Sequence, residues 1–370
     1  MKAQGLFSTV YVLSFIFLIL QGCSKNTASV IPEKPMFFVK GETITLSSQL
    51  TSYPLKKDAK ITSVYKIGAG GSVKTYKSGS DYLLTKDGGI QRTVNSAIPD
   101  FSTYNVIFDS NGMFSYTPQN PPFPFFWQVM IDYTIETDST IHSQSLYLSD
   151  TLKSKILSKK DLSIYSIGTS ITAGANTAVT WYGQVATEIY PNFVGRALNK
   201  LYGNLVTVTN LAVGGATSEL LTANVTKIKA DKPDLVFIEF GMNEHDRSKN
   251  MDEYLDNIEV DVKSIKASGI DCVIVGFLQQ NPKWNNESYP RSVYFNLQLN
   301  EIAKRNGCFF ADIYKAFGGL PQTKLYTDIL ADYIHHPTEF GQKIYYLTTM
   351  PVFLFDDNVT ETKLLSFIQQ

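Results

Sequence analysis

The stretch that decides the fold reads Tyr165-Ser166-Ile167-Gly168-Thr169-Ser170-Ile171-Thr172-Ala173-Gly174, and the apolar run Leu162-Ser163-Ile164 precedes it. We interpret the apolar part as a buried strand that stops abruptly at Gly168-Thr169-Ser170. Open α/β sheets bind their ligands beyond the carboxyl ends of their strands. A serine at such a strand end is either a helix cap or a nucleophile. On this stretch alone, both interpretations of Ser170 stay open.

The composition of the 370-residue chain is that of an ordinary globular protein, with 44% hydrophobic residues. The length favours two domains. The formal net charge is −1 and the sequence contains no long basic run. We therefore expect no nucleic-acid partner.

The first residues resemble a bacterial lipoprotein signal peptide. Lys2 supplies a positive charge, residues 6–20 are apolar, and Leu20-Gln21-Gly22-Cys23 follows. We expect residues 1–22 to be the signal peptide, Cys23 to carry a lipid, and residues 23–35 to be a tether. The lipid anchor would hold the protein on a membrane of the cell envelope, in the periplasm or at the outer membrane. An ordinary signal peptide or a membrane anchor is the alternative, although the apolar run is short for a span of ~20 residues.

Two further cysteines, Cys272 and Cys308, lie in apolar, strand-like runs. We interpret them as buried free thiols, although an exported protein also permits a disulfide. The Cys and His residues do not have the spacing of a zinc site, so we expect no metal.

Residues 36–150 show alternating apolar and polar residues with frequent turns. Strand-like runs occur at residues 43–46, 60–65, 104–108, 113–116, 128–135 and 145–148. This pattern predicts an all-β sandwich or jelly-roll-like domain. Asn111-Gly112 separates two of the runs and predicts a β-hairpin. Residues 151–160, which are rich in Lys and Ser, are predicted to be a linker.

Residues 161–370 alternate apolar runs with segments of helical periodicity. After the strand at Leu162, strand candidates lie at residues 205–208, 234–240, 272–278 and 308–313. The clearest helix carries one apolar stripe, formed by Met251, Leu255, Ile258, Val262 and Ile265. Strands separated by helices predict an α/β domain with a parallel sheet that helices cover on both faces.

Four polar or glycine-containing stretches follow strands of this second domain: residues 168–170, 210–217, 241–244 and 332–337. Singly, each is explained by a turn, a helix cap or a polar loop. Together they contain a hydroxyl, an imidazole with a nearby carboxylate, and amide donors. Ester hydrolysis needs this set of groups, and parallel topology brings the strand ends together.

In order and motifs these stretches resemble the SGNH hydrolases, also called the GDSL esterase/lipase family. Ser170, Gly215, Asn243 and His336 match the four family blocks, over about residues 160–355. The resemblance implies a flavodoxin-like, three-layer α/β fold and an ester hydrolase that needs no cofactor.

This sequence departs from the family pattern at three places. Thr169 replaces the family's Asp, and Glu244 replaces the Asp after the conserved Asn. The last block, Asp332-Tyr333-Ile334-His335-His336-Pro337, has one residue more. We favour His336 as the base because it directly precedes Pro337 and a helix start. His335 is the alternative, since it has the usual three-residue spacing from Asp332.

The resemblance implies acyl transfer through an acyl-serine. Ser170 would attack the carbonyl, His336 would act as base and then acid, and Asp332 would hold the imidazole. The backbone N–H groups of Ser170 and Gly215 and the amide of Asn243 would bind the oxyanion.

Two other groups of polar residues permit a less specific interpretation. His245 and Asp246 could be imagined as a metal site with the last block, but that would leave Ser170 and Gly215 unexplained. We expect His245 to line the cleft or to be exposed, and His142 to be structural or solvated.

Three functions follow as hypotheses. The first is an exported carbohydrate O-acetyl esterase, acting on an acylated carbohydrate or another small ester. The second is a lipase or thioesterase that acts on acyl chains. The third is a glycan-binding surface lipoprotein with a decayed site, which only Thr169 and Glu244 favour.

Overall fold

The computed structural model of the chain describes residues 36–177, 188–246, 250–286, 291–320, 322 and 324–368. Met36–Gln370 form one compact unit. The predicted signal peptide, Cys23 and the tether lie outside the described residues. Within the described parts, none of the helices has the length and apolar character that crossing a bilayer requires.

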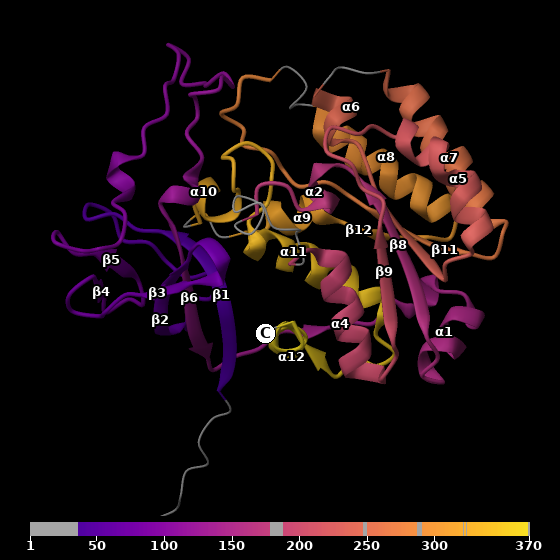
Figure 1. The fold of residues 1–370 in the computed structure, drawn as a ribbon, viewed down its shortest axis with the longest axis horizontal. Helices are drawn as coiled ribbons and strands as arrows, with labels where there is room; N and C mark the ends of the chain where they lie inside the picture. The colour runs from indigo at the N-terminus through magenta and orange to yellow at the C-terminus, as the bar shows by residue number, and fades with distance from the viewer. Residues whose placement is uncertain are drawn as a thin grey trace, which may run out of the picture. The chain divides into compact units, whose positions relative to one another are not determined.

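A parallel sheet of five strands forms the centre of the C-terminal region, in the order β12-β11-β10-β8-β9 (Figure 1). Its strands are β8 (Leu162–Gly168), β9 (Val206–Asn210), β10 (Leu235–Glu239), β11 (Asp271–Val275) and β12 (Phe309–Ala311). Each neighbouring pair is parallel. Every residue of β10 and β11 is buried, as is expected for parallel strands with both faces covered. The predicted α/β fold class is confirmed. Cys272 in β11 and Cys308 before β12 are buried free thiols, as predicted.

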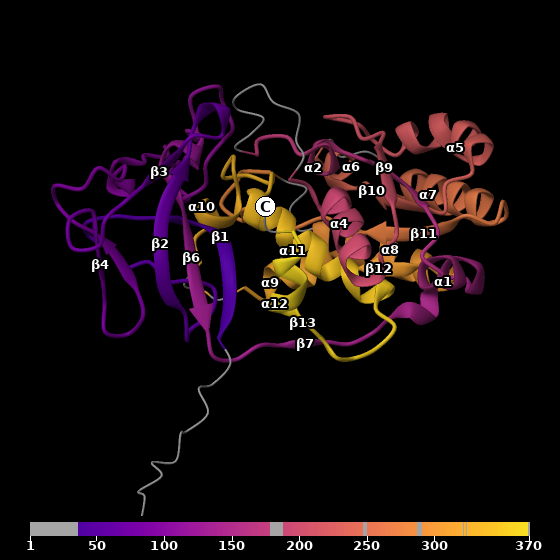
Figure 2. The ribbon, with the colours of Figure 1, turned by 60° about the horizontal axis from the view of Figure 1, so that its bottom comes forward.

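Helices cover both faces of this sheet (Figure 1, Figure 2). One face packs against α5 (Glu219–Asp231), α7 (Met251–Lys266) and α8 (Ser292–Arg305), and the other against α4 (Tyr190–Tyr202) and α11 (Glu339–Thr349). The shorter helices are α2 (Ser170–Ala173), α6 (Met242–Asp246), α9 (Ile313–Gly318), α10 (Tyr326–Ile329) and α12 (Glu361–Ser366). The predicted apolar stripe of α7 faces the core, since Ile258, Val262 and Ile265 are buried.

Residues 151–160, the predicted linker, begin with helix α1 (Asp150–Leu157). The Ser149 hydroxyl caps the helix by accepting a hydrogen bond from the Leu152 N–H group. Leu152 and Ile156, four residues apart, are buried on one helix face. Of its charged residues, Asp150 is exposed, whereas Lys155 forms an ion pair with Asp234 over 2.7 Å.

The N-terminal region is built from antiparallel strands, so its predicted all-β character is confirmed. One sheet has the order β1-β6-β2-β3, with β1 (Phe37–Thr45), β2 (Lys60–Ile67), β3 (Val73–Thr75) and β6 (Gln128–Ile135). A second sheet pairs β4 (Tyr82–Leu84) with β5 (Ile90–Arg92). Ser145–Tyr147 form a 3-10 helix in place of the predicted strand.

The predicted hairpin around Asn111-Gly112 is also wrong, although the turn itself forms. Gly112 donates its N–H to the Asp109 carbonyl over 3.0 Å. The flanking residues do not form the two strands of a hairpin. Instead, the Phe114 N–H donates to the Lys283 carbonyl over 2.9 Å, and Phe114 and Trp284 form an isolated β-bridge. A partner distant in sequence has replaced the local one.

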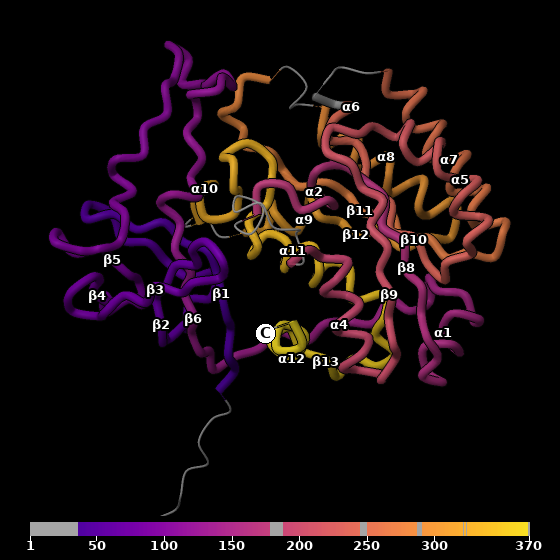
Figure 3. The backbone as a smooth tube through the Cα atoms, viewed as in Figure 1, coloured from indigo at the N-terminus to yellow at the C-terminus, as the bar shows by residue number. Residues whose placement is uncertain are grey.

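The two regions share buried polar contacts and a strand pair. The Lys324 ammonium lies 2.7 Å from Glu42 Oε1, and the side chains of both residues are buried. The Thr45 N–H donates to Asp328 Oδ1 over 2.7 Å. Near the C-terminus, β13 (Val359–Thr360) pairs with β7 (Thr140–Ile141), and α12 lies beside β1 (Figure 3).

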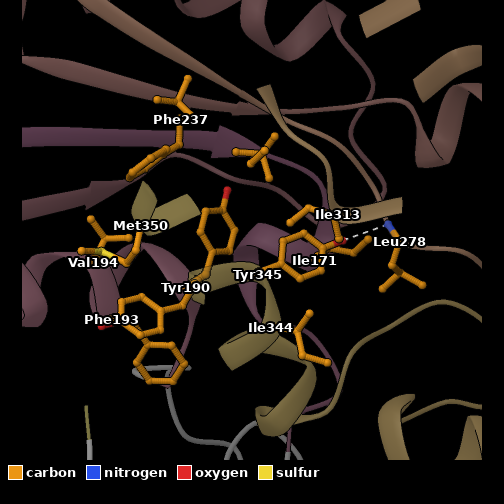
Figure 4. Packing of buried hydrophobic residues seen from close by; sticks show 14 of the residues in the cluster. Ile171, Tyr190, Phe193, Val194, Phe237, Leu278, Ile313, Ile344, Tyr345 and Met350 are labelled. Carbon is orange, nitrogen blue, oxygen red and sulfur yellow. Dashed lines mark hydrogen bonds between the residues drawn. The ribbon is translucent and has the colours of Figure 1, made fainter. Parts of the chain in front are cut away.

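An aromatic core connects the sheet to the helices that carry the site (Figure 4). The rings of Tyr190 and Tyr345 stack with centroids 5.5 Å apart, and Tyr190 also meets Phe237 of β10 edge-on. The Tyr345 hydroxyl accepts a hydrogen bond from the Leu278 N–H group over 3.1 Å. Ile171 of α2 is fully buried in the same core. The short helix that begins with Ser170 therefore rests on a close-packed base.

Candidate active site

Ser170 lies where strand β8 gives way to helix α2, and its neighbour provides the helix cap. The Thr169 hydroxyl accepts a hydrogen bond from the Ile171 N–H group over 3.2 Å. Because Thr169 fills the capping position, the Ser170 hydroxyl is not needed there. The side chain of Ser170 is also partly exposed. The structure thus separates the two roles that the sequence left open.

The structure brings Ser170, His336 and Asp332 together in one hydrogen-bonded line. The Ser170 hydroxyl oxygen lies 2.8 Å from His336 Nε2. His336 Nδ1 lies 2.5 Å from Asp332 Oδ2 on the opposite side of the ring. A neutral imidazole with Nδ1 protonated would donate to Asp332 and accept the serine proton at Nε2. This arrangement can convert a serine hydroxyl into a nucleophile.

Asp332 is buried and held by its own loop. Its Oδ1 accepts the backbone N–H groups of Ile334, His335 and His336 over 2.8, 2.9 and 3.0 Å. Burial acts to raise the pKa of Asp332, but the neighbouring His336, by charge and hydrogen bond, holds it well below its usual range. The carboxylate therefore stays ionised and can stabilise an imidazolium.

The same loop makes an unusual turn at Tyr333, whose φ of 65° lies in the left-handed region. This is uncommon for a residue with a large side chain. Asn281 supports the turn, because its Nδ2 donates to the Tyr333 carbonyl over 3.0 Å and its own N–H donates to Ile334 O over 2.9 Å.

The sequence reasoning missed a buried carboxyl group beneath the serine. Glu239, the last residue of β10, accepts hydrogen bonds at Oε2 from the Thr169 N–H, the Thr169 hydroxyl and the Thr172 hydroxyl. Burial raises the pKa of Glu239 to about 7, because these hydrogen bonds only partly offset the lost hydration. A charged residue that ends the apolar run 235–238 was the available signal.

Gly168 allows this close approach between β8 and β10. A Cβ at position 168 would lie 2.6 Å from the Glu239 carbonyl oxygen and 2.8 Å from the Thr172 hydroxyl. Both separations are too short for any side chain. Glycine at this position therefore lets the serine loop contact the Glu239 carboxyl directly.

The second and third blocks meet beside the serine. The Val213 N–H donates to the Gly168 carbonyl over 3.1 Å, and a Cβ on Gly214 would touch the Ser170 Cβ at 3.9 Å. Gly215 has φ 75°, a conformation that favours glycine. Asn243 is buried and donates from Nδ2 to the Ala216 carbonyl over 2.7 Å. Its amide thus lies against the loop that contains Gly215.

Glu244, one of the departures from the family pattern, ties these loops together. Its carboxylate accepts the backbone N–H groups of Ser218 and Gly241. Burial raises the pKa of Glu244, and the backbone hydrogen bonds oppose this effect. The longer side chain therefore has a structural task at the start of α5 and α6.

The other three histidines have different surroundings. The His335 ring lies 4.4 Å from the His336 ring and 5.7 Å from the Trp284 ring, measured between centroids. His142 is exposed, with Nδ1 3.8 Å from Asp357. The side chains of His245 and Asp246 lie outside the described part of the structure.

One group among the described residues could hold a metal ion by proximity. Ligand atoms of Asp332, His335 and His336 lie within 4.8 Å of one another. However, both ring nitrogens of His336 already have partners, at Ser170 and at Asp332. The hydrogen bonds to Ser170 and within the pair explain the positions of Asp332 and His336 without an ion.

Comparisons with known proteins agree with this geometry. Residues 166–344 match the model of the GDSL-like Lipase/Acylhydrolase family. Residues 166–344 are thus a GDSL-like lipase/acylhydrolase domain, as in SGNH hydrolases, and the protein is a carboxylic ester hydrolase. A comparison with curated protein sequences gives no match.

Two solved structures illustrate the similarity. The acetylxylan esterase Axe2 from Geobacillus stearothermophilus is 23% identical, with a TM-score of 0.46, and the match covers 53% of this chain and 95% of that chain. TesA is 21% identical, with a TM-score of 0.41, and the match covers 52% of this chain and 97% of that chain.

Proposed function

We propose that the protein is an exported, lipid-anchored carbohydrate O-acetyl esterase that works through an acyl-serine. The observation that carries the mechanism is the line from Ser170 Oγ through the His336 ring to Asp332, with contacts of 2.8 and 2.5 Å. Ser170 attacks the acyl carbonyl while His336 takes its proton. His336 then returns the proton to the leaving alcohol, and Asp332 stabilises the imidazolium. A water molecule, activated by His336 in the same way, then attacks the acyl-serine and releases acetate.

The oxyanion is assigned to the backbone N–H groups of Ser170 and Gly215 and to the amide of Asn243. Gly214 lies against Ser170, and Asn243 lies against the same loop. The Asn243 amide carries two hydrogens; one binds the Ala216 carbonyl, and we assign the other to the oxyanion.

Two features of the chain support a glycan substrate outside the cell. Residues 1–22 resemble a lipoprotein signal peptide, with Cys23 as the residue that would carry the lipid. A region of antiparallel sheets precedes the hydrolase residues, and we take it as consistent with a polymeric substrate. The complete Ser–His–Asp line supports an active enzyme over a decayed site.

The mechanism is tested by Ser170→Ala. We expect loss of esterase activity by at least about a thousandfold with an unchanged melting temperature. Activity near the parent level would overturn the assignment of the nucleophile.

The substrate is tested with an ester series and a polysaccharide panel. Hydrolysis of 4-nitrophenyl acetate should exceed that of the octanoate, and acetate should be released from at least one acetylated polysaccharide. Preference for octanoate would point to a lipase or thioesterase instead.

The anchor is tested by Cys23→Ala in the full-length chain. The parent should fractionate with membranes and incorporate labelled fatty acid, and the variant should do neither. A variant that still incorporates the label would refute lipidation at Cys23.

A further inference from the structure

The proposed mechanism determines where the alcohol part of an ester must lie. The leaving oxygen has to receive its proton from His336 Nε2, so the alcohol must lie next to the His336 ring. The acyl oxygen instead faces the loops of Gly215 and Asn243. Side chains beside the His336 ring are therefore candidates for recognition of the alcohol, and this inference rests on the proposed function.

Two partly buried rings extend from that position. The His335 ring lies against the His336 ring, and the Trp284 indole lies against the His335 ring at 5.7 Å with an angle of 40°. Trp284 is half-buried, so part of its surface is open. The rings of His336, His335 and Trp284 thus follow one another, with centroids 4.4 and 5.7 Å apart.

The backbone around Trp284 is fixed on both sides. Its N–H donates to the Asn281 carbonyl over 3.0 Å, and its own carbonyl accepts the Asn286 N–H over 2.8 Å. The Asn285 N–H donates to the Phe114 carbonyl over 2.7 Å. The indole is therefore held on a pre-formed segment, which reduces the ordering cost of binding.

The N-terminal region supports this segment with further aromatic residues. The loop between β5 and β6 reaches the chain that follows β11 (Figure 1). There Phe114 stacks on Tyr333 of the Asp332 loop at 5.3 Å and meets Phe108 edge-on at 6.1 Å. Lys283 Nζ lies 5.5 Å from the Phe108 ring centre. The N-terminal region thus contacts both the Trp284 segment and the loop of the base.

We propose that Trp284, together with His335, forms the platform that binds the sugar ring of the leaving alcohol. A pyranose has an apolar C–H face that packs on an indole, and its hydroxyls point outward at the edges. Lys283 and Asn285, the sequence neighbours of Trp284, are exposed, and we assign the contacts with those hydroxyls to them. A straight acyl chain would not use these edge donors.

The test compares esters that share an acetyl group and differ in the alcohol. We would measure kcat/KM for acetylated methyl pyranosides and for ethyl acetate, following acetate release. Ethyl acetate has no ring, whereas a nitrophenyl ester could itself stack on Trp284. Trp284→Ala should lower kcat/KM for the pyranosides by a factor at least tenfold larger than for ethyl acetate. Trp284→Phe should restore part of the kcat/KM for the pyranosides.

Phe126→Ala is the control, because Phe126 is a 57% exposed aromatic residue of the N-terminal region. This variant should keep the parent's ratio of kcat/KM for the pyranosides to kcat/KM for ethyl acetate. Melting temperatures of all variants show whether the fold survives, and Trp284→Phe provides the test if Trp284→Ala does not fold.

The possible failures are distinguishable. Equal losses on pyranosides and ethyl acetate, in an enzyme that deacetylates pyranosides, would overturn the platform alone. If Trp284→Ala instead lowers kcat/KM selectively for ethyl octanoate, Trp284 lies on the acyl side and the sugar platform is overturned. A parent enzyme that hydrolyses ethyl acetate and no acetylated pyranoside would overturn both the platform and the proposed carbohydrate substrate.

Discussion

The hydroxyl of Thr169 donates a hydrogen bond to the buried carboxyl group of Glu239 over 2.8 Å, directly beneath the serine loop. The Thr169 N–H reaches the same oxygen over 3.1 Å. The residue that replaces the family's Asp therefore binds a carboxyl group from the neighbouring strand. Thr169 thus both caps α2 and fixes the end of β8 to the end of β10.

Glu239 should make stability depend on pH. Its pKa is raised to about 7 in the folded protein, so the folded state retains a proton that the unfolded state has lost above about pH 4.5. This contribution is fully present below that pH and disappears as the pH rises to about 7. The loss is roughly 3 kcal/mol over this range. In urea unfolding at pH 5 and pH 8, Glu239→Gln should show a smaller difference than the parent; an identical difference would contradict the prediction.

His336 and His335 should differ in their contributions to the rate. Only His336 contacts both Ser170 and Asp332 through its ring. His336→Ala should lower kcat/KM for 4-nitrophenyl acetate by orders of magnitude, and His335→Ala by less than about tenfold, which is ~1.4 kcal/mol. A reversed order would make Asp332 and His335 the working pair.

Asn243→Ala should lower kcat by about a hundredfold or more with little change in KM, because an oxyanion donor acts in the transition state. Its amide also holds the Ala216 carbonyl, so the variant could move the loop. Asn243→Asp is a second variant, which keeps the shape and replaces the amide by a carboxylate that can donate neither to the oxyanion nor to the Ala216 carbonyl. If both variants retain parent kcat, Asn243 is not an oxyanion donor.

The buried ion pair between Lys324 and Glu42 should matter for stability. Lys324→Met would leave Glu42 buried without its cation, at a cost of about 3–5 kcal/mol. Lys304→Met is the matched control, because Lys304 pairs with Glu301 at the surface and such pairs contribute below about 1 kcal/mol. Equal shifts of the urea midpoint for the two variants would contradict the burial argument.

Features set by short sequence patterns could be predicted. The strand that ends at Gly168 and the apolar stripe of α7 are visible as local periodicity, and both exist in the structure. Helix α1 was not predicted, because only two of its residues, Leu152 and Ile156, are buried and most of their neighbours in sequence are polar or charged. Short helices gain stability from tertiary packing, which composition does not reveal.

Features set by distant partners could not be predicted. Phe114 pairs beside Trp284, and the local Asn-Gly turn gave no sign of this. Glu239 gains its role only when β8 and β10 lie together, since its partners Thr169 and Thr172 are far from it in sequence. The site was recognisable from four blocks, whereas its supporting carboxyl group was not.

The contact between Thr45 and Asp328 joins positions 283 residues apart in the chain. During synthesis, the first strand therefore appears long before its buried partner exists. Closing so long a loop costs conformational entropy before the contact can compensate. The N-terminal sheet consequently completes its packing only after almost the whole chain has emerged. This late docking keeps the newly made chain open for longer than a protein with local contacts would remain.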